Sequence, residues 1–216
     1  MKYIGTNTIF RSGLVLALCL LCTALLYSYS DDKISTSQRE FDRRNLFKIL
    51  TPDLFNNDLL LDTYLLRAAE EQEGLIGVSA LGLRRDRLAY IARQDEEVVA
   101  VLVPATVADG FNGFVDLLIA VNMQGRILNA SVIEDIETDA LYGVVKVIDS
   151  HWMKNFTGNT MRDMRRLSWS TIEPVPGEYD QFVGASLTPK AVANRIYDAL
   201  VFFQSNRIVL MQGDQS

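Results

Sequence analysis

The sequence predicts an α+β protein, in which an N-terminal transmembrane helix precedes a domain with an antiparallel sheet and a C-terminal helix. Three patterns predict this class: an uncharged apolar run at 12–30, alternating apolar residues at 114–121, and a helical stripe that follows residue 188. Strands paired through short turns and then followed by helices are typical of α+β domains. With 216 residues, 49% of them hydrophobic, the chain can form one membrane segment and one domain with a core.

The apolar run has the flanks of a membrane segment. Lys2 and Arg11 precede it and acidic residues follow it, and the basic flank of such a segment stays in the cytoplasm. We therefore expect residues 31–216 outside the cytoplasm. The run ends in "SYS", which also fits a signal-peptidase site. Tyr27 and Tyr29 are suited to the membrane interface, so we favour an uncleaved single-pass anchor over a cleaved signal.

The exterior part is divided by hydrophobic period and by turn residues. The expected elements are an amphipathic helix over 35–50 that ends at Thr51-Pro52, a less clear helical pattern around 59–69, strand pairs at 88–104 and 114–133, a helix at 144–156, and a final helix from residue 188. A further strand near 167–172 is an alternative for that stretch. Alternation in 115–121 predicts one buried face for that strand. The order is therefore helix, four antiparallel strands, helix and helix.

Composition excludes several classes of function. A net charge of −6 and a pI near 4.9 leave no basic face for nucleic acid. Both cysteines, Cys19 and Cys22, lie in the apolar run, and His151 is the one histidine. We therefore expect neither a metal site nor catalytic residues within this chain.

The start of the final helix carries the candidate site. Thr188 suits the N-cap and Pro189 the first helical position. A helix N-terminus attracts phosphate through its free N–H groups, and the preceding stretch adds close backbone approach at Gly184, a small residue at Ala185 and a hydroxyl at Ser186. Lys190 adds a cation in the first turn. Two interpretations stay open from these residues: a phosphate-binding site and an ordinary capped helix.

The stretch "DQFVGASLTPKAV" resembles the flavinylation motif of the FMN-binding domain, and specifically that of the G subunit of the Rnf ion-translocating oxidoreductase complex. The similarity extends over residues 90–135 and, with the anchor, over nearly the whole chain. The resemblance implies FMN attached by a phosphoester to Ser186, by a separate flavin transferase, with Asp180 as the upstream acid of the motif. Gly184, Ala185 and Thr188 complete the implied cofactor-binding set.

The resemblance also implies a function, a location and partners. The chain would be an electron-transfer subunit that carries FMN in a complex coupling NADH/ferredoxin electron transfer to ion translocation. It would lie in the bacterial inner membrane with its bulk in the periplasm, beside the other Rnf subunits. The expected division is an anchor at 1–30, a helical linker region at 31–85, an FMN-binding domain at 86–205 and a tail at 206–216.

This sequence departs from the motif at three places. Ser186 stands where the family has Thr, Val183 replaces a hydroxyl residue, and residues 137–143 alter the sequence of a loop expected near the flavin ring. Two alternatives follow: a flavin-free assembly subunit of the same complex, and a free-standing extracytoplasmic FMN-binding domain.

Other residues are weaker candidates. The aromatic residues Tyr142, Trp152 and Trp169 suit ring stacking but also ordinary packing, and His151 fits a surface position near a helix start. The arginines at 162, 165 and 166 suit either an anionic partner or a solvated face.

Overall fold

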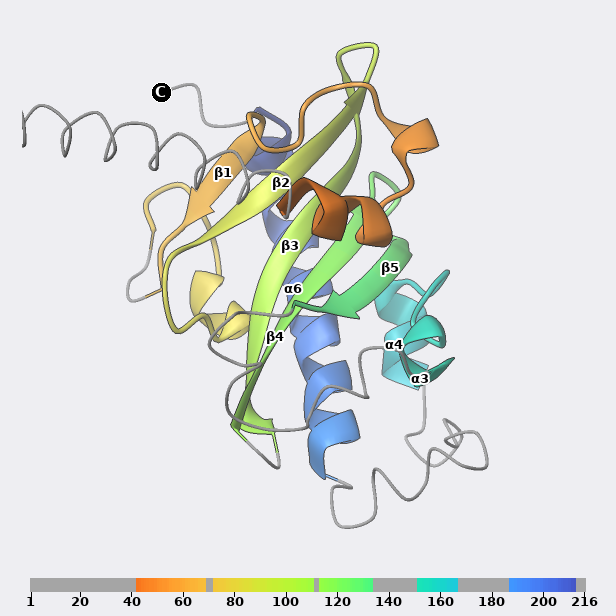
Figure 1. Cartoon of the computed structure of the whole chain (residues 1–216). Coiled ribbons are helices and arrows are strands. Elements are labelled where there is room, and N and C mark those ends of the chain that lie inside the picture. Colours follow the sequence, from red (N-terminus) through yellow and green to blue (C-terminus); the bar gives the residue numbers. More distant parts are fainter. Residues whose placement is uncertain (1–41, 69–71, 111–112, 134–150, 167–186, 213–216) are drawn as a thin grey trace, which may run out of the picture. The chain divides into compact units, whose positions relative to one another are not determined.

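The protein is built around a five-stranded antiparallel sheet in which neighbours in sequence are neighbours in space, in the order β1-β2-β3-β4-β5 (Figure 1). The computed structural model describes residues 42–68, 72–110, 113–133, 151–166 and 187–212. The strands are β1 (Thr63–Leu66), β2 (Arg87–Gln94), β3 (Glu97–Gly110), β4 (Gly113–Asn122) and β5 (Ile127–Val132). The predicted antiparallel sheet is confirmed, with one strand more than we expected.

Both predicted hairpins are confirmed. Asp95 and Glu96 form the two-residue turn between β2 and β3, and both adopt positive φ, at 51° and 70°. Such a turn matches the right-handed twist of the flanking strands. Gly125, with φ at 75°, serves the turn between β4 and β5.

The helical pattern expected around 59–69 is wrong, because this stretch contains strand β1. Thr63 pairs with Tyr90 and Leu66 with Arg87 along β2. Only Leu66 of this strand is buried. A short edge strand therefore takes its conformation from its partner rather than from its own hydrophobic period.

Helix α6 (Leu187–Gln212) covers one face of the sheet (Figure 1). The predicted stripe is confirmed, since all of its members are buried: Val192, Ile196, Ala199, Leu200 and Phe203. They pack on the residues of β4 that we expected on a buried face: Val115, Leu117, Ile119 and Val121. The helix continues to Gln212, so residues 206–212, expected in a tail, belong to it.

The opposite face of the sheet is also buried, which the alternation in β4 did not predict. Its strand residues are Ala92, Ala100, Leu102, Leu118 and Ala120. Residues of the preceding segment cover them: Leu46, Ile49, Leu50, Phe55 and Leu59. The expected helix before Thr51-Pro52 is present over residues 42–49, and its later part supplies two of these side chains, Leu46 and Ile49.

The chain divides into two compact units, Met1–Arg44 and Asn45–Ser216. Residues 45–85 therefore belong to the same unit as the sheet, so the boundary expected at residue 85 does not separate a linker from a domain. The predicted anchor at 12–30 lies outside the described residues. Among the helices that the structure describes, none is both long enough and apolar enough to cross a membrane.

Four short helices complete the described chain: η1 (Pro52–Leu54), η2 (Val78–Leu81), α3 (His151–Lys154) and α4 (Met161–Arg166). Of the helix expected at 144–156, residues 151–156 are described: 151–154 form α3, and 155–156 lie in a turn. The arginine-rich stretch at 161–166, for which we expected no particular element, forms α4. The alternative strand at 167–172 lies outside the described residues.

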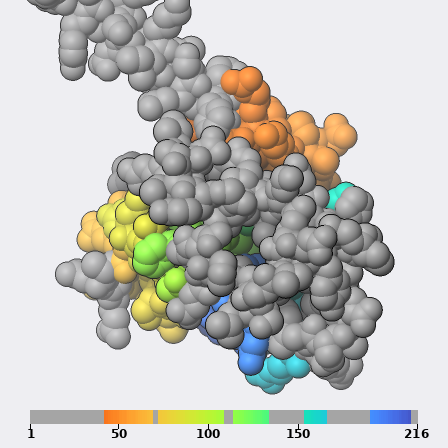
Figure 2. All heavy atoms as spheres, turned by 60° about the horizontal axis from the view of Figure 1, so that its bottom comes forward, coloured from red at the N-terminus to blue at the C-terminus, as the bar shows by residue number. Residues whose placement is uncertain are grey.

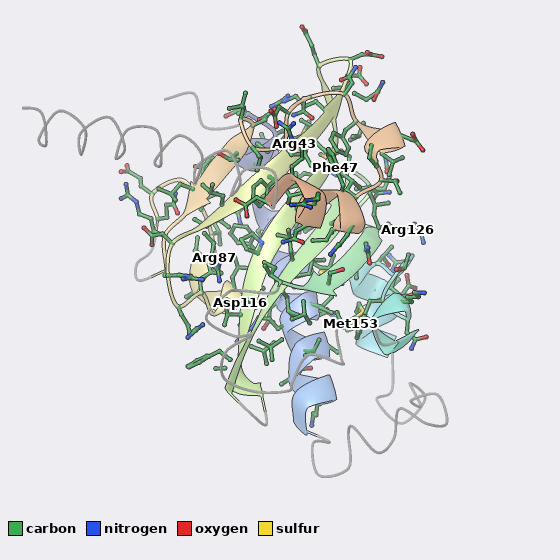
Figure 3. The ribbon with its side chains drawn as sticks, in the orientation of Figure 1. Arg43, Phe47, Arg87, Asp116, Arg126 and Met153 are labelled. Atoms are coloured by element: carbon green, nitrogen blue, oxygen red, sulfur yellow. The ribbon has the colours of Figure 1, made fainter. Side chains whose placement is uncertain are left out.

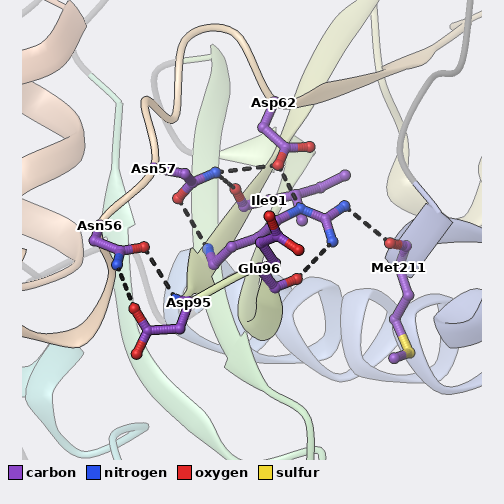
Figure 4. Close-up of polar contacts among 8 residues, drawn as sticks. Asn56, Asn57, Asp62, Ile91, Asp95, Glu96 and Met211 are labelled. Carbon is purple, nitrogen blue, oxygen red and sulfur yellow. Dashed lines mark hydrogen bonds and ion pairs between the residues drawn. The ribbon is translucent and has the colours of Figure 1, made fainter.

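The Asn57 amide connects the segment before β1 to strand β2, by bonding to backbone N–H and C=O groups of β2 as a neighbouring strand would. Asn57 donates to the Ile91 carbonyl at 2.8 Å and accepts from the Arg93 N–H at 2.9 Å (Figure 4). The Arg93 guanidinium then donates to Asp62 at 2.6 Å and to the Met211 carbonyl at 3.0 Å. A cation at the last carbonyls of α6 also complements the helix dipole, so this network holds the C-terminal end of α6 against β2.

Candidate functional site

The candidate site is the start of α6. Ser186, which the resemblance marks for FMN, immediately precedes the first residue of the helix, Leu187. Ser186, Gly184, Ala185 and Asp180 lie outside the described residues, as does the loop at 137–143. Of the predicted cofactor-binding set, the structure therefore describes only the helical backbone at Thr188.

The prediction that Thr188 is the N-cap is wrong. Helix α6 begins at Leu187, so Thr188 is its second residue and Pro189 its third. Proline is tolerated there because the first N–H groups of a helix have no acceptor within it. Leu187 and Thr188 then bring free N–H groups to the first turn. The exposed Lys190 adds a positive charge, and this combination suits a phosphate.

Contacts at the other end of α6 fix the direction of the helix. The Arg93 guanidinium holds the Met211 carbonyl, and the Arg207 guanidinium donates to the Met123 carbonyl at 3.1 Å. The C-terminal part of α6 therefore lies at the β2–β3 and β4–β5 turns. Its start lies at the opposite end of the sheet, where β3 and β4 join through residues 110–113 (Figure 1). Figure 2 looks towards this end and shows the first turns of α6 in light blue.

A buried carboxylate organises the same end of the sheet. Asp116 of β4 is only 7% exposed, and its Oδ1 accepts a 2.5 Å hydrogen bond from the Thr106 hydroxyl on β3. The Arg87 guanidinium, from the start of β2, forms an ion pair with Oδ2 of Asp116 (Figure 3). A buried charge needs such partners, because an unpaired carboxylate would lose its hydration without compensation. Asp116 thus links β2, β3 and β4.

A second arginine lies at the edge of this cluster. Arg84 Nη2 is 3.9 Å from Asp116 Oδ2, and its side chain is 42% exposed. Its guanidinium carbon lies 4.2 Å from the centroid of the Phe114 ring, in cation–π geometry. Phe114 is itself 47% exposed. An exposed cation is thereby held in place over an exposed aromatic ring.

Arg195 joins α6 to the segment around η2. Its guanidinium donates to the Ala80 carbonyl and lies 3.5 Å from Asp198. Burial raises the pKa of Asp198, and the charge of Arg195 partly opposes that rise. Gly82 makes the contact possible, because a Cβ there would lie 2.8 Å from the Arg195 guanidinium carbon. The first half of α6 is therefore fixed to the segment that connects β1 and β2.

The other sequence candidates are spread over the molecule. His151 and Trp152 open α3, whereas Tyr142 and Trp169 lie outside the described residues. On α4, the Arg165 Nε donates to the Tyr197 hydroxyl of α6 at 3.1 Å. Among the described residues, no three His, Cys, Asp or Glu side chains lie together as metal ligands.

Sequence reasoning missed the cluster of Thr106, Asp116 and the arginines at 84 and 87. Two signals for it were present. The stretch "LRRDRL" concentrates positive charge in an acidic chain, and Asp116 interrupts the apolar run "FVDLLIAV". Neither signal names a partner, because the cluster arises from the pairing of Thr106 with Asp116 across two strands.

The comparisons with known proteins first define a class. The FMN-binding domain family matches residues 110–201, which include β4, β5 and the first half of α6. This stretch is therefore similar to FMN-binding domains, and the start of α6 lies within the matched residues.

The full-length relatives then give the family. The chain is 30% identical to the G subunit of the ion-translocating oxidoreductase complex from Pseudomonas aeruginosa (strain UCBPP-PA14), over 97% of this chain and 95% of that protein. The proteins of the same name from Haemophilus influenzae (strain PittEE) and Salmonella typhi are 27% and 30% identical, over 93% and 92% of this chain and 90% and 93% of theirs. This chain belongs to the family of G subunits of ion-translocating oxidoreductase complexes, so the resemblance seen in the sequence is confirmed.

Proposed function

We propose that this chain is the FMN-carrying subunit of an ion-translocating oxidoreductase complex, with the cofactor joined through its phosphate to Ser186. The observation that carries the proposal is the position of Ser186, directly before the first residue of α6 in a chain of this family. The free N–H groups of the first turn and the exposed Lys190 fit a phosphate group. Gly184 and Ala185 let that phosphate approach the backbone closely.

In this proposal the protein holds and orients the cofactor. Bound FMN supplies one- and two-electron redox chemistry, while the chain supplies attachment, orientation and surroundings. Covalent attachment prevents loss of FMN to the periplasm. Electrons pass to and from the other subunits of the complex, which couples their transfer between NADH and ferredoxin to ion movement.

We further propose that residues 12–30 are an uncleaved anchor in the inner membrane, with residues 31–216 in the periplasm. Lys2 and Arg11 before the apolar run support this orientation. Sequencing the N-terminus of the membrane-extracted protein tests the anchor, since a mature chain that began at Asp31 would contradict it. Reporter fusions at the C-terminus test the orientation.

The experiment that tests attachment is expression of the full chain together with a flavin transferase, followed by denaturation and intact-mass measurement. We expect an added mass of one FMN and flavin fluorescence that survives unfolding. Ser186→Ala should abolish both signals, because it removes the hydroxyl that forms the phosphoester. Thr188→Ala is the matched control, since it removes a nearby hydroxyl and should leave the adduct in place.

Two other outcomes would contradict the proposal. An adduct that persists in Ser186→Ala would move the attachment elsewhere. An unmodified parent chain, with the transferase active on a Thr-containing relative, would favour a flavin-free assembly subunit, which the departures at Val183 and Ser186 also allow. Recovery of the adduct in Ser186→Thr would then assign the loss to that single residue.

A further inference from the structure

The sheet face opposite α6 carries an exposed cationic and aromatic patch at the end where β3 and β4 join. Phe114 lies on this face, because an even number of residues along β4 separates it from Leu118 and Ala120, whose side chains face away from α6. Leu88 lies on the same face of β2 and is also exposed. We call Arg84, Arg87, Leu88, Phe114 and Asp116 the hairpin-end patch.

The patch has a surplus positive charge. Asp116 is satisfied at close range by the Thr106 hydroxyl and by Arg87, which leaves Arg84 at a longer 3.9 Å. The two arginines and one aspartate sum to +1, whereas the whole chain carries −6. A local positive field on an acidic protein favours an acidic partner over a basic one.

Arg84 is also preorganised. Its guanidinium is held over the Phe114 ring at 4.2 Å and near Asp116, while its side chain stays 42% exposed. A partner that binds a cation already held in place loses less side-chain entropy on binding. Arginine and aromatic residues are enriched in protein interfaces and among the residues that dominate binding energy. A lipid surface would need no such fixed geometry, so the arrangement favours a protein.

The position of the patch agrees with electron transfer. Arg84 and Phe114 lie at the end of the sheet where α6 begins, whereas the C-terminal end of α6 lies at the opposite turns. A partner seated on the hairpin-end patch would therefore lie at the end of the domain that would carry the flavin. Electron-transfer partners bind through small interfaces steered by charge, and this patch has that character.

We propose that the hairpin-end patch is the docking surface for another subunit of the complex, which presents an acidic rim around an apolar centre. The acidic rim would meet Arg84, and the apolar centre would contact Phe114 and Leu88. This inference rests on the proposed function, because it takes the partner from the complex and its purpose from the flavin at Ser186.

The test uses the full chain, tagged and co-expressed with the other subunits and the flavin transferase, then purified in mild detergent. Arg84→Glu reverses the exposed charge, and Phe114→Ala removes the ring. We expect each to reduce the amount of co-purified subunits at about 0.15 M salt by roughly tenfold, with a larger loss for Arg84→Glu at lower salt. The matched control is Arg162→Glu, the same reversal at an exposed arginine of α4, which should retain the subunits.

Several outcomes separate the explanations. Equal loss in Arg162→Glu would overturn the proposal in favour of a general charge effect, and full retention in Arg84→Glu and Phe114→Ala would overturn it directly. Retention of the subunits combined with lost binding to phosphatidylglycerol vesicles would assign the patch to lipid instead. Intact mass and thermal unfolding of each variant report flavin loading and folding separately. If the parent chain carries no flavin but co-purifies with the subunits, and Arg84→Glu loses them, the proposed cofactor attachment is refuted and the docking surface is supported.

Discussion

At the residue scale, Asn206 shows how one polar side chain joins distant parts of this chain. It is 2% exposed, and its Oδ1 accepts from the Ile76 N–H at 2.7 Å while its Nδ2 donates to the Ile76 carbonyl at 2.8 Å. The same Nδ2 also donates to the Phe202 carbonyl within α6. The buried amide thus satisfies both the backbone N–H and the backbone C=O of Ile76, as the backbone of a neighbouring strand would do.

We predict that Asn206→Asp destabilises the fold by about 3 kcal/mol at neutral pH. The carboxylate would keep one acceptor role but would face the carbonyls of Ile76 and Phe202 without a donor. Burial and these carbonyls should raise the pKa of the new carboxyl in the folded state. The loss should therefore be smallest below about pH 4, where the carboxyl is protonated in both states, and should grow as pH rises through the raised pKa.

Denaturant unfolding of variant and parent across pH measures this effect. Asn194→Asp on the exposed side of α6 is the matched control, and it should change stability by less than about 0.5 kcal/mol. A loss in Asn206→Asp that did not vary with pH would contradict the role of the buried charge.

At the element scale, the contact between α6 and the loop after η2 depends on Gly82. This residue has φ at +64°, and a Cβ there would lie 2.7 Å from the Thr106 carbonyl oxygen. The same Cβ would lie 2.8 Å from the Arg195 guanidinium. Glycine at this position lets the first half of α6, β3 and the loop meet at one point.

We predict that Gly82→Ala lowers the free energy of unfolding by about 2–4 kcal/mol, because it adds a steric clash to an unfavourable φ. Gly77→Ala is the matched control, since Gly77 also has positive φ, at 76°, but has nothing within 4 Å of the Cβ position. It should cost only about 1–2 kcal/mol. Equal losses in the two variants, measured by denaturant unfolding, would show that the clash at the contact with α6 does not contribute to the loss of stability in Gly82→Ala. Removal of the guanidinium by Arg195→Ala in the Gly82→Ala background should recover part of the loss.

At the scale of the whole molecule, the sheet is covered on both faces, and the second cover comes from residues 45–59. Five apolar side chains of this segment are buried against strands β2, β3 and β4. Each fully buried side chain of this kind contributes about 2 kcal/mol. Their sum is comparable with the total stability of a typical domain, so the sheet should depend on this segment.

We predict that a chain beginning at Asn45 folds cooperatively, whereas a chain beginning at Asp62 aggregates or unfolds without a sharp transition. The first retains the cover over the second face, and the second exposes Leu102 and Leu118 together with neighbouring alanines. Size-exclusion chromatography and thermal unfolding measure the difference, and both chains lack the apolar N-terminal run. A monomeric chain from Asp62 with the same melting temperature would contradict this account.

The sequence by itself determined the features that depend on local periodicity and turn chemistry. The stripe of α6 and the two hairpins with their turns at Asp95-Glu96 and Gly125 were predictable, because each is specified by residues close together in the chain. The motif around Ser186 was predictable in the same way, and its family is confirmed, while attachment there remains a prediction.

Only the tertiary structure decided the features that join distant segments. Strand β1 is extended because it pairs with β2, and five apolar side chains of residues 45–59 are buried because they pack on the second face of the sheet. The Asp116 cluster follows from the register of β3 and β4 and from the arginine that begins β2. These contacts lie too far apart in the chain for any local pattern to specify them, since the free energy that selects them comes from burial and pairing in the folded state.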